Sequence, residues 1–421
     1  MSEGHTPTRR TPSSRERPGR SGAALAPPVL LVVLALLAVM GVRLAGPCDG
    51  DPGCFVVAGV NFTDPAEAGI PALTGAGADG YDGQFFWRLS RSPDELQQSE
   101  VHGVALDSPI RAGRPGYPAV VWVLSAGGRK GLVDWTLILV NLTATALLSM
   151  LLGATALRNG LSPWLGAAAA LWPGLLFAVG RDLSEPGAAL LIVVGLAALN
   201  RNRPELAGLA WVGAVLWREQ SIVVPAAFGA CWLVQLLRTG GTRSSLRQVT
   251  AWLAPLAAFL SWQAIALQAV GKAPVLESGE ANASIPLADL ARAAAGWVSF
   301  DEGVVGLVWL IELCLVLAIV AAALVVALRD RRWEGVAVLF GIALLVSASE
   351  NVWSGPAHLR YATDLVMTAW FLLLTTTVRQ RGQAQSRPVE ALARAGGFRA
   401  VLVGAQLGAA TLASSFLVRT F

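Results

Sequence analysis

The run VVGLVWLIELCLVLAIVAAALVVAL, residues Val304 to Leu328, consists almost entirely of apolar side chains. A helix of roughly 20 such residues is long enough to cross the roughly 30 Å hydrocarbon core of a bilayer. The composition of the whole chain agrees with this, because 54% of its residues are hydrophobic and only 14% are charged. Soluble domains have about 45–50% and 25%, respectively. The sequence therefore predicts an integral membrane protein.

Similar apolar runs occupy most of the remaining chain. They are Val29–Val42, Leu132–Leu157, Pro163–Val179, Pro186–Leu199, Leu206–Trp217, Ile222–Leu237, Val249–Val270, Gly335–Ser347, Ala362–Val378 and Ala400–Val418. We therefore predict an all-α fold with about eleven transmembrane helices. All of them belong to one polytopic membrane domain over residues 29–421.

The N-terminal residues 1–28 are rich in Ser, Pro and Arg and show no apolar period. This composition predicts a disordered, basic, cytoplasmic tail. A cleaved signal peptide that ends in Val29–Val42 is the alternative. The many spans that follow favour an uncleaved first helix instead.

Two polar connections separate the apolar runs, and both are predicted to lie outside the membrane. The first covers residues 46–131 and contains Tyr117–Ala126, which is apolar but too short to cross, so we expect a helix at the membrane interface. The second covers residues 271–303, with an amphipathic surface helix expected over Leu287–Phe300. Cys48 and Cys54 lie close together in the first connection, either as a disulfide or as two free thiols.

Arginines are concentrated in the connections that this topology assigns to the cytoplasm. They include Arg158, Arg201, Arg203, Arg238, Arg243, Arg247, Arg329, Arg331, Arg332, Arg379 and Arg381. Because positively charged loops stay in the cytoplasm, we expect a cytoplasmic N-terminus and an extracytoplasmic first loop. The formal charge of +4 comes largely from these loops and the tail. No basic stripe is interleaved with stacking aromatics, so a nucleic-acid partner is not expected.

The first polar connection contains the stretch GADGYDGQFFWRLSR, residues Gly77 to Arg91. Asp79 and Asp82 are candidate catalytic carboxylates there, with Tyr81 and Gln84 as candidate substrate contacts. Ionisable groups held against a membrane bundle are expensive and commonly functional. The alternative is that both carboxylates only bond local backbone amides, because Asp-Gly is a common turn sequence.

Three short connections each place an arginine beside a carboxylate. They contain Arg181 and Asp182 with Glu185, Arg218 with Glu219, and Arg360 with Asp364. The planar guanidinium binds phosphate oxygens through two parallel hydrogen bonds. These arginines, joined by Arg111 and Arg114, are therefore a candidate collar for an anionic lipid phosphate. Ion pairs that merely cap helix ends are the alternative.

Four motifs carry a resemblance to a known family. They are YDGQ at 81–84, RAGRPGYP at 111–118, RDLSEP at 181–186 and WREQ at 217–220. In this order they resemble a largely uncharacterised bacterial branch of the GT-C glycosyltransferases, marked by YDGQF, an arginine-rich segment ending in YP, RDLTEP and TRE. The resemblance covers roughly residues 77–225. The chain departs from the branch at Trp217, where threonine is usual, and at Phe86 and Trp87, where two tyrosines are usual.

The resemblance implies a function and roles for these residues. GT-C enzymes are multi-span proteins that take a sugar from a polyprenyl-phosphate carrier on the outer face of the membrane. This implies inverting transfer to an envelope glycan, lipid or protein at a bacterial plasma membrane, with Asp82 as general base and Asp79 as its helper. The implied phosphate holders are Arg181, Arg218 and Arg360. The side chains implied to orient them are Gln84, Asp182, Glu185 and Glu219.

Other functions and a metal remain as alternatives. A transporter or lipid-linked-sugar flippase would also have many spans and buried arginines, but no clear internal repeat joins the two halves of the chain. An envelope polymerase usually places its large outer loop late in the chain, whereas here the longest one comes first. A structural scaffold is the fourth reading. No cofactor is required, and Mg or Mn held by Asp79 and Asp82, as in some GT-C members, is the alternative.

Overall fold

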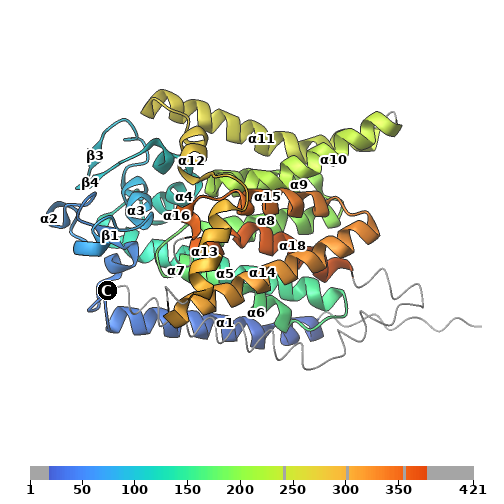
Figure 1. Ribbon diagram of the computed structural model, residues 1–421, viewed down its shortest axis with the longest axis horizontal. Coiled ribbons are helices and arrows are strands. Elements are labelled where there is room, and N and C mark those ends of the chain that lie inside the picture. Colours follow the sequence, from blue (N-terminus) through green and yellow to red (C-terminus); the bar gives the residue numbers. More distant parts are fainter. Residues whose placement is uncertain (1–18, 240–242, 300–302, 354–356, 377–421) are drawn as a thin grey trace, which may run out of the picture.

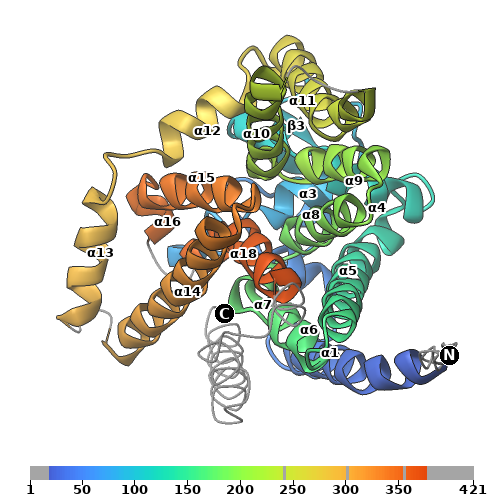
Figure 2. The ribbon, with the colours of Figure 1, turned by 90° about the vertical axis from the view of Figure 1, so that its right-hand side faces the viewer.

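The computed structural model describes residues 19–239, 243–299, 303–353 and 357–376, and most of them are helical (Figure 1). The long helices run along the long axis of the molecule, and a segment of short helices and strands lies at one end. Viewed end-on in Figure 2, α1 (Gly19–Ala45) and α11 (Arg243–Val270) lie at opposite sides, with α8 (Glu185–Asn200) and α18 (Thr363–Thr376) between them. The described chain is thus a helical bundle with a polar segment at one end.

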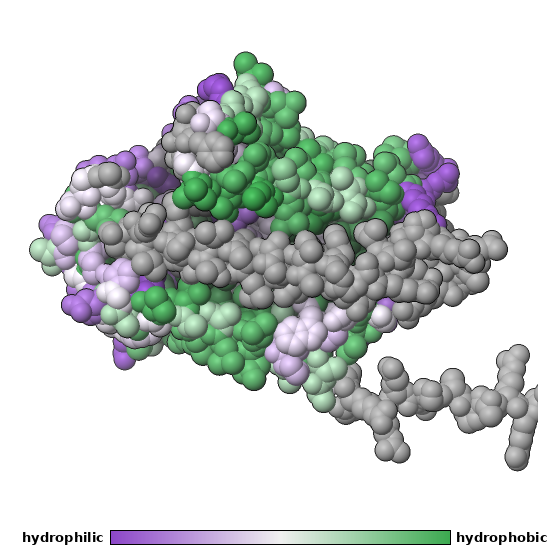
Figure 3. All heavy atoms as spheres, turned by 60° about the horizontal axis from the view of Figure 1, so that its bottom comes forward, coloured by the Kyte–Doolittle hydropathy of each residue, from purple (hydrophilic) through white to green (hydrophobic). Residues whose placement is uncertain are grey.

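Five helical stretches are long and apolar enough to cross a membrane. They are Gly22–Ala45 in α1, Lys130–Arg158 (α5), Glu219–Arg238 in η4 (Glu219–Ile222) and α10 (Val223–Thr239), Leu246–Val270 in α11, and Gly303–Asp330 (α14). Among the residues that are coloured in Figure 3, apolar side chains predominate between the two ends of the molecule, and polar side chains gather mostly toward the ends. The chain is therefore a candidate multi-pass membrane protein with five possible spans.

The prediction of about eleven crossings is wrong for the part of the chain that the structure describes. Four of the predicted crossings form apolar helices of only 10–17 residues, namely α8, α9 (Pro204–Trp217), α15 (Glu334–Val346) and α18. At 1.5 Å per residue, the 14 residues of α9 reach about 21 Å, which is less than the hydrocarbon thickness.

A fifth predicted crossing, Pro163–Val179, is divided into α6 (Trp164–Ala170) and α7 (Pro173–Val179). Pro173 has no amide hydrogen to bond the preceding turn, so it starts a new helix instead of continuing α6. The predicted crossing Ala400–Val418 lies outside the described residues. Apolar runs of 12–17 residues were therefore predicted to cross the membrane, although the helices that they form are too short to span it or are interrupted.

The predicted disordered tail is corrected over part of its length. Residues 1–18 lie outside the described chain, but Gly19–Pro28 belongs to α1, which continues without a break to Ala45. Alanines and leucine favour helix here, and the helix continues although Pro27 and Pro28 lie inside it and each lacks an amide hydrogen for the preceding turn.

Small residues allow the helices around α8 to approach closely. In α8, a Cβ on Gly195 would collide with the ring of Trp211, a buried residue of α9. The indole Nε1 of Trp211 donates to the carbonyl oxygen of Ile192 at 3.2 Å. On the other side of α9, Gly208 lies against the carbonyl of Thr250 in α11. Such close contacts between small residues and backbone are typical of helix packing in membranes.

The polar segment between α1 and α5 contains several short elements. They are η1 (Pro52–Val56), β1 (Ala58–Gly59), α2 (Pro65–Ala68), β2 (Ala72–Leu73), η2 (Gly75–Gly77), α3 (Gly83–Arg91), β3 (Glu100–Val101), β4 (Val104–Ala105), η3 (Pro109–Gly113) and α4 (Gly116–Leu124). β1 pairs with β2 in parallel, and β3 pairs with β4 antiparallel. A disulfide joins Cys48 to Cys54, which decides between the two alternatives for these thiols. The short apolar helix predicted at 117–126 is present as α4.

The second polar connection forms α12 (Pro274–Asn282) and α13 (Ala288–Val298). The helix predicted at 287–300 is confirmed as α13, whereas α12 was not predicted. Past α12, Ala283 forms an isolated β-bridge with Ala348, which precedes α16 (Glu350–Trp353) and α17 (Ala357–Tyr361). The amide of Ser349 also donates to the carbonyl of Asn282 at 2.9 Å. These bonds join the second polar connection to the segment that leads into α17.

Candidate active site

The position of α3 is fixed by two glycines of the GADGYDGQ stretch. Gly80 has φ +62° and lies against the backbone of β1 and Val57, so a side chain there would be both strained and obstructed. A Cβ on Gly83 would lie against the carbonyl oxygens of Val56 and Arg181. These contacts seat the first turn of α3 on the bundle and place Asp82, the residue before the helix, at a defined point.

Three arginines converge on the carboxylate of Asp82. Arg111 Nη1 donates to Oδ1 at 2.6 Å, and Arg360 Nη2 donates to Oδ2 at 2.6 Å. Arg114 Nη1 is 3.5 Å from Oδ2. Although Asp82 stands at the N-terminus of α3, its side chain makes no capping bond to the helix amides. The alternative that Asp82 serves only a local turn is therefore contradicted by its side-chain contacts.

A second set of carboxylates holds each arginine from its far side. Arg114 forms a two-bond pair with Glu219, with Nε and Nη2 both at 2.7 Å from the carboxylate oxygens. Arg360 Nε donates to Glu185 Oε1 at 2.5 Å. Arg111 is held at 2.8 Å by Asp107. Each arginine is thus braced between an outlying carboxylate and Asp82.

The ion pairs join residues of different short connections rather than residues of the same connection. Arg218, whose sequence neighbour is Glu219, donates instead to Asp364 at 3.2 Å and lies 3.7 Å from Glu185. Ser221 Oγ donates to the second oxygen of Asp364 at 2.8 Å. The pairs therefore link different turns and hold distant parts of the chain together, whereas the alternative to a phosphate collar was that each pair only caps its own helix end.

A cavity of about 350 Å³ opens beside Asp82. Four arginines, Arg111, Arg114, Arg218 and Arg360, line it together with Asp79 and Asp82. The lining also includes aromatic and neutral polar residues, namely Phe62, Tyr81, Phe85, Tyr361, Gln220, Ser278, Asn282 and Asn351, and a few small or aliphatic residues. Three of these, at 278, 282 and 351, come from the two segments that the Ala283–Ala348 bridge joins. The cavity therefore combines a cationic side with hydroxyl and amide groups.

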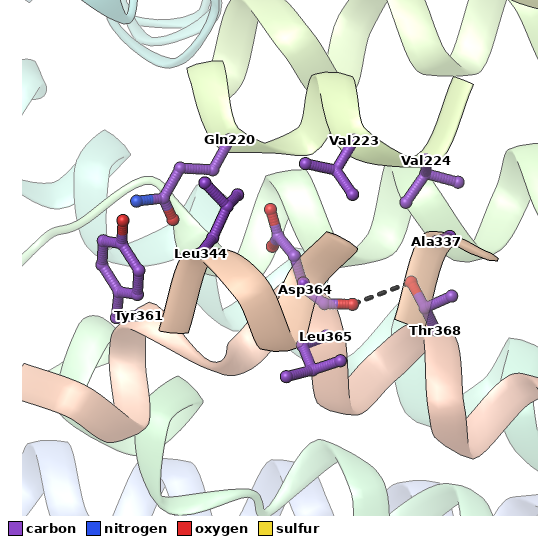
Figure 4. Close-up of a pocket in the computed structure, with 10 residues that line it drawn as sticks. Gln220, Val223, Val224, Ala337, Leu344, Tyr361, Asp364, Leu365 and Thr368 are labelled. Carbon is purple, nitrogen blue, oxygen red and sulfur yellow. Dashed lines mark hydrogen bonds between the residues drawn. The ribbon is translucent and has the colours of Figure 1, made fainter. Parts of the chain in front are cut away.

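A smaller pocket of about 30 Å³ lies between α10, α15 and α18 (Figure 4). Gln220 and Tyr361 line both spaces, and Figure 4 shows them at one end of the pocket. The remaining lining is mainly apolar, with Val223, Val224, Ala337, Gly341, Leu344 and Leu365 beside Asp364 and Thr368. A polar cavity is thus followed by an apolar pocket beside α10, a candidate membrane span.

The mutual charges keep the groups of the cluster ionised. Burial alone would raise the pKa of the Asp82 carboxyl, but the charges of Arg360, Arg111 and Arg114 outweigh it and hold this pKa well below its ordinary value. For Arg114 and Arg360, burial lowers the pKa, and the neighbouring carboxylates more than reverse this, so both pKa values are raised. At neutral pH the cluster therefore contains charged arginines and an ionised Asp82.

Three of the predicted site residues are placed next to the cavity in supporting roles. Tyr81 lines it, packs edge-on against Phe177 and lies 5.3 Å below the guanidinium of Arg360. Asp79 also lines it and accepts from Asn61 at 2.6 Å. Gln84 does not line the cavity. It is fully buried, accepts from the amide of β1 at Gly59 and donates to the carbonyl of Asp79, so it fixes the loop.

Two other predicted residues lie behind the site rather than in it. The guanidinium of Arg181 stacks 3.9 Å from the ring of Phe177, and burial lowers its pKa to about 10. Asp182, with φ +50°, is completely buried, and burial raises its pKa well above the ordinary value. Neither residue lines the cavity. Of the predicted phosphate holders, Arg218 and Arg360 reach the cavity and Arg181 does not.

The described side chains do not fit a divalent cation. Within the described ranges, no group of three or more His, Cys, Asp or Glu is arranged to hold a metal ion. Both oxygens of Asp82 face guanidinium groups, and Asp79 is turned to Asn61. A cluster of arginines repels cations, so the two aspartates are not arranged as a Mg or Mn site.

Several cavity residues were not predicted from the sequence. They are Phe62, Gln220, Ser278, Asn282, Asn351 and Tyr361. Gln220 could have been predicted, because it belongs to the WREQ motif. The asparagines had no local signal, because they reach the cavity through the bridge between two distant segments.

Comparison with known proteins gives no independent assignment. No protein-family model and no curated protein matches this chain. The function must therefore be argued from the arginine cluster, the cavity and the membrane character of the bundle.

Proposed function

We propose that this protein is an integral membrane glycosyltransferase that moves a sugar from a polyprenyl-phosphate carrier to a hydroxyl group of an envelope acceptor. The observation that carries the proposal is the placement of one carboxylate, Asp82, among three arginines at the wall of a cavity. Such a site contains both a candidate proton acceptor and donors for a phosphate. The four motifs that resemble the GT-C branch supply the reaction class.

The arginines would bind the phosphate of the carrier. In each of Arg111, Arg114 and Arg360, a carboxylate outside the cavity lining fixes one part of the guanidinium, while another nitrogen contacts Asp82 at the cavity wall. This bracing orients the donors before any ligand arrives. Preorganised donors of this kind stabilise negative charge that grows on a leaving phosphate.

Asp82 would serve as the general base. The oxygen of the acceptor hydroxyl attacks the anomeric carbon, and its proton passes to the Asp82 carboxylate. The bond between the anomeric carbon and the phosphate oxygen breaks, and its electron pair leaves with the phosphate. One displacement of this kind inverts the anomeric centre.

The surroundings of the cavity fit a sugar that is linked to a lipid phosphate. Aromatic rings at Tyr81 and Phe85, and amides at Asn282 and Asn351, are suited to the faces and hydroxyl groups of a sugar. Apolar side chains beyond Gln220 and Tyr361 lie beside a candidate span, so the lipid of the donor would extend from the cavity toward that side. We place the reaction at the extracytoplasmic face of a bacterial plasma membrane, with the N-terminus in the cytoplasm, because the arginine-rich connections favour that orientation.

The proposal is tested in a strain that lacks this gene. Mass spectrometry of envelope glycans and lipid-linked sugars is expected to show one missing decoration and an accumulated polyprenyl-phosphate sugar. Wild type should restore both, and Asp82→Asn at matched expression should restore neither. If Asp82→Asn restores the decoration fully, Asp82 is not the base. If a lipid-linked sugar accumulates only on the cytoplasmic leaflet, the protein is a flippase rather than a transferase.

A further inference from the structure

The carboxylate of Asp82 is bound in the way that a ligand oxyanion would be bound. Its two oxygens accept from Arg111 and Arg360 at 2.6 Å, and Arg114 approaches at 3.5 Å. These three arginines come from η3, the residue after η3, and α17. No other carboxylate is shared by all three arginines among the described ion pairs.

The other carboxylates that hold these arginines do not occupy the position of Asp82. Asp107, Glu219 and Glu185 each hold one of the arginines and are absent from the cavity lining, whereas Asp82 is part of it. The cluster therefore contains three permanent pairs and one shared anion that faces the open space. An entering phosphate and Asp82 need the same N–H donors, so both cannot be held at full strength.

We propose that the Asp82 carboxylate occupies the seat of the ligand's phosphate in the ligand-free protein, and that binding exchanges one anion for the other. This inference rests on the proposed function for the identity of the oxyanion as a phosphate ester. Phosphate oxygens would take the donors of Arg111, Arg114 and Arg360, and Asp82 would swing away from them into the cavity beside α3.

The exchange couples ligand binding to the basicity of the Asp82 carboxylate. While three arginines hold it, Asp82 is a weak proton acceptor, because they keep its pKa well below the ordinary value. Once a phosphate has taken the arginines, the freed carboxylate lies next to a negative charge and gains basicity. Asp82 is therefore activated only when a phosphate-bearing donor is in place.

The test measures binding of farnesyl phosphate, a short polyprenyl phosphate, to the full-length protein in detergent by calorimetry. Asp82→Asn removes the carboxylate that competes with the phosphate for the arginines. This substitution is expected to tighten binding of farnesyl phosphate about 10- to 100-fold, the effect of losing one competing charge-assisted contact. Asp94→Asn is the matched control, because it removes the same charge from the same polar segment at an exposed position that neither lines the cavity nor holds an arginine of the cluster in the described ion pairs. Its effect should be no more than about threefold.

The outcomes separate this inference from the proposed function. If Asp82→Asn binds farnesyl phosphate as weakly as wild type, or more weakly, the exchange is refuted while the phosphate site stands. If both variants tighten binding equally, net charge explains the effect and the exchange is also refuted. If wild type and both variants bind farnesyl phosphate no better than farnesol, the arginines are not a phosphate site and the proposed function fails as well.

A second measurement uses wild type alone and does not require that Asp82→Asn folds. Inorganic sulfate keeps its charge near about pH 5, so any proton taken up on binding comes to the protein. Exchange predicts uptake of a fraction of a proton as sulfate displaces Asp82, seen by calorimetry in buffers of different ionisation enthalpy. Sulfate binding without proton uptake would overturn the exchange.

Discussion

Arg360 joins two carboxylates with different nitrogens of one guanidinium, and lysine cannot reproduce this. Its Nε donates to Glu185 at 2.5 Å and its Nη2 donates to Asp82 at 2.6 Å. Glu185 is fully buried, and its next cation, Arg218, is 3.7 Å away. In Arg360→Lys, one ammonium nitrogen replaces two nitrogens that a rigid plane holds toward the two carboxylates, so at least one of the two contacts is expected to lengthen and weaken.

The expected cost follows from the loss of one of these bonds. A hydrogen bond between charged groups contributes about 1.5–3 kcal/mol, and leaving a buried acceptor unpaired costs a comparable amount. We therefore expect Arg360→Lys to lower the free energy of unfolding by about 1.5–3 kcal/mol. If the lysine stays with Glu185, the phosphate loses one donor, and kcat/KM for transfer falls roughly 10- to 100-fold.

Two assays measure these effects on the purified protein. Thermal unfolding in detergent reports stability, and transfer from a lipid-linked sugar reports kcat/KM. Arg247→Lys is the matched control, because the side chains of Arg247 and its partner Glu205 are 66% and 51% exposed, so both assays should stay near wild type. An Arg360→Lys protein that equals wild type in both would refute the bridging role of the guanidinium.

Three further outcomes are expected. Asp82→Asn should lower kcat about 10²- to 10⁴-fold in the transfer assay, as for loss of a general base, and a smaller loss would exclude that role. Because the pKa of Asp82 is depressed in the folded protein, its ion pairs stabilise fully above about pH 4 and are lost as the pH falls further. Asp82→Asn should therefore show a smaller acid-dependent drop in melting temperature than wild type, and the remaining drop comes from other carboxylates with a lowered pKa, such as Glu219. Reducing the Cys48–Cys54 disulfide should lower stability by about 2 kcal/mol, and an unchanged melting temperature with reductant would contradict this.

The sequence was informative about the chemistry of the site because its motifs are local. GADGYDGQ contains both the carboxylate and the two glycines that seat it, and the arginines of the later connections were expected at one place. The carboxylate partner of each arginine could not be predicted from the sequence. Glu219 pairs with Arg114 across 105 residues rather than with the adjacent Arg218, and no local pattern encodes such a partner.

The number of crossings was overestimated for a related reason. Hydropathy measures how apolar a run is, but it does not distinguish a helix in lipid from a short one packed against protein. α8 and α9 are apolar enough for either, and Gly195 and Gly208 bring them against neighbouring helices instead. Pro173 gave a usable signal, because a proline in the middle of a run starts a new helix.

The length of chain between Asp82 and Arg360 has a consequence for biosynthesis. The two residues are 278 positions apart, yet their side chains are in direct contact. At a translation rate of about 5–20 residues per second, Arg360 is added roughly 15 to 55 seconds after Asp82. Arg111 and Arg114 can reach the carboxylate early, but the third arginine arrives only when most of the chain has been made. A truncated nascent chain would thus insert its early helices with an incomplete site, and activity would begin only with a nearly full-length product.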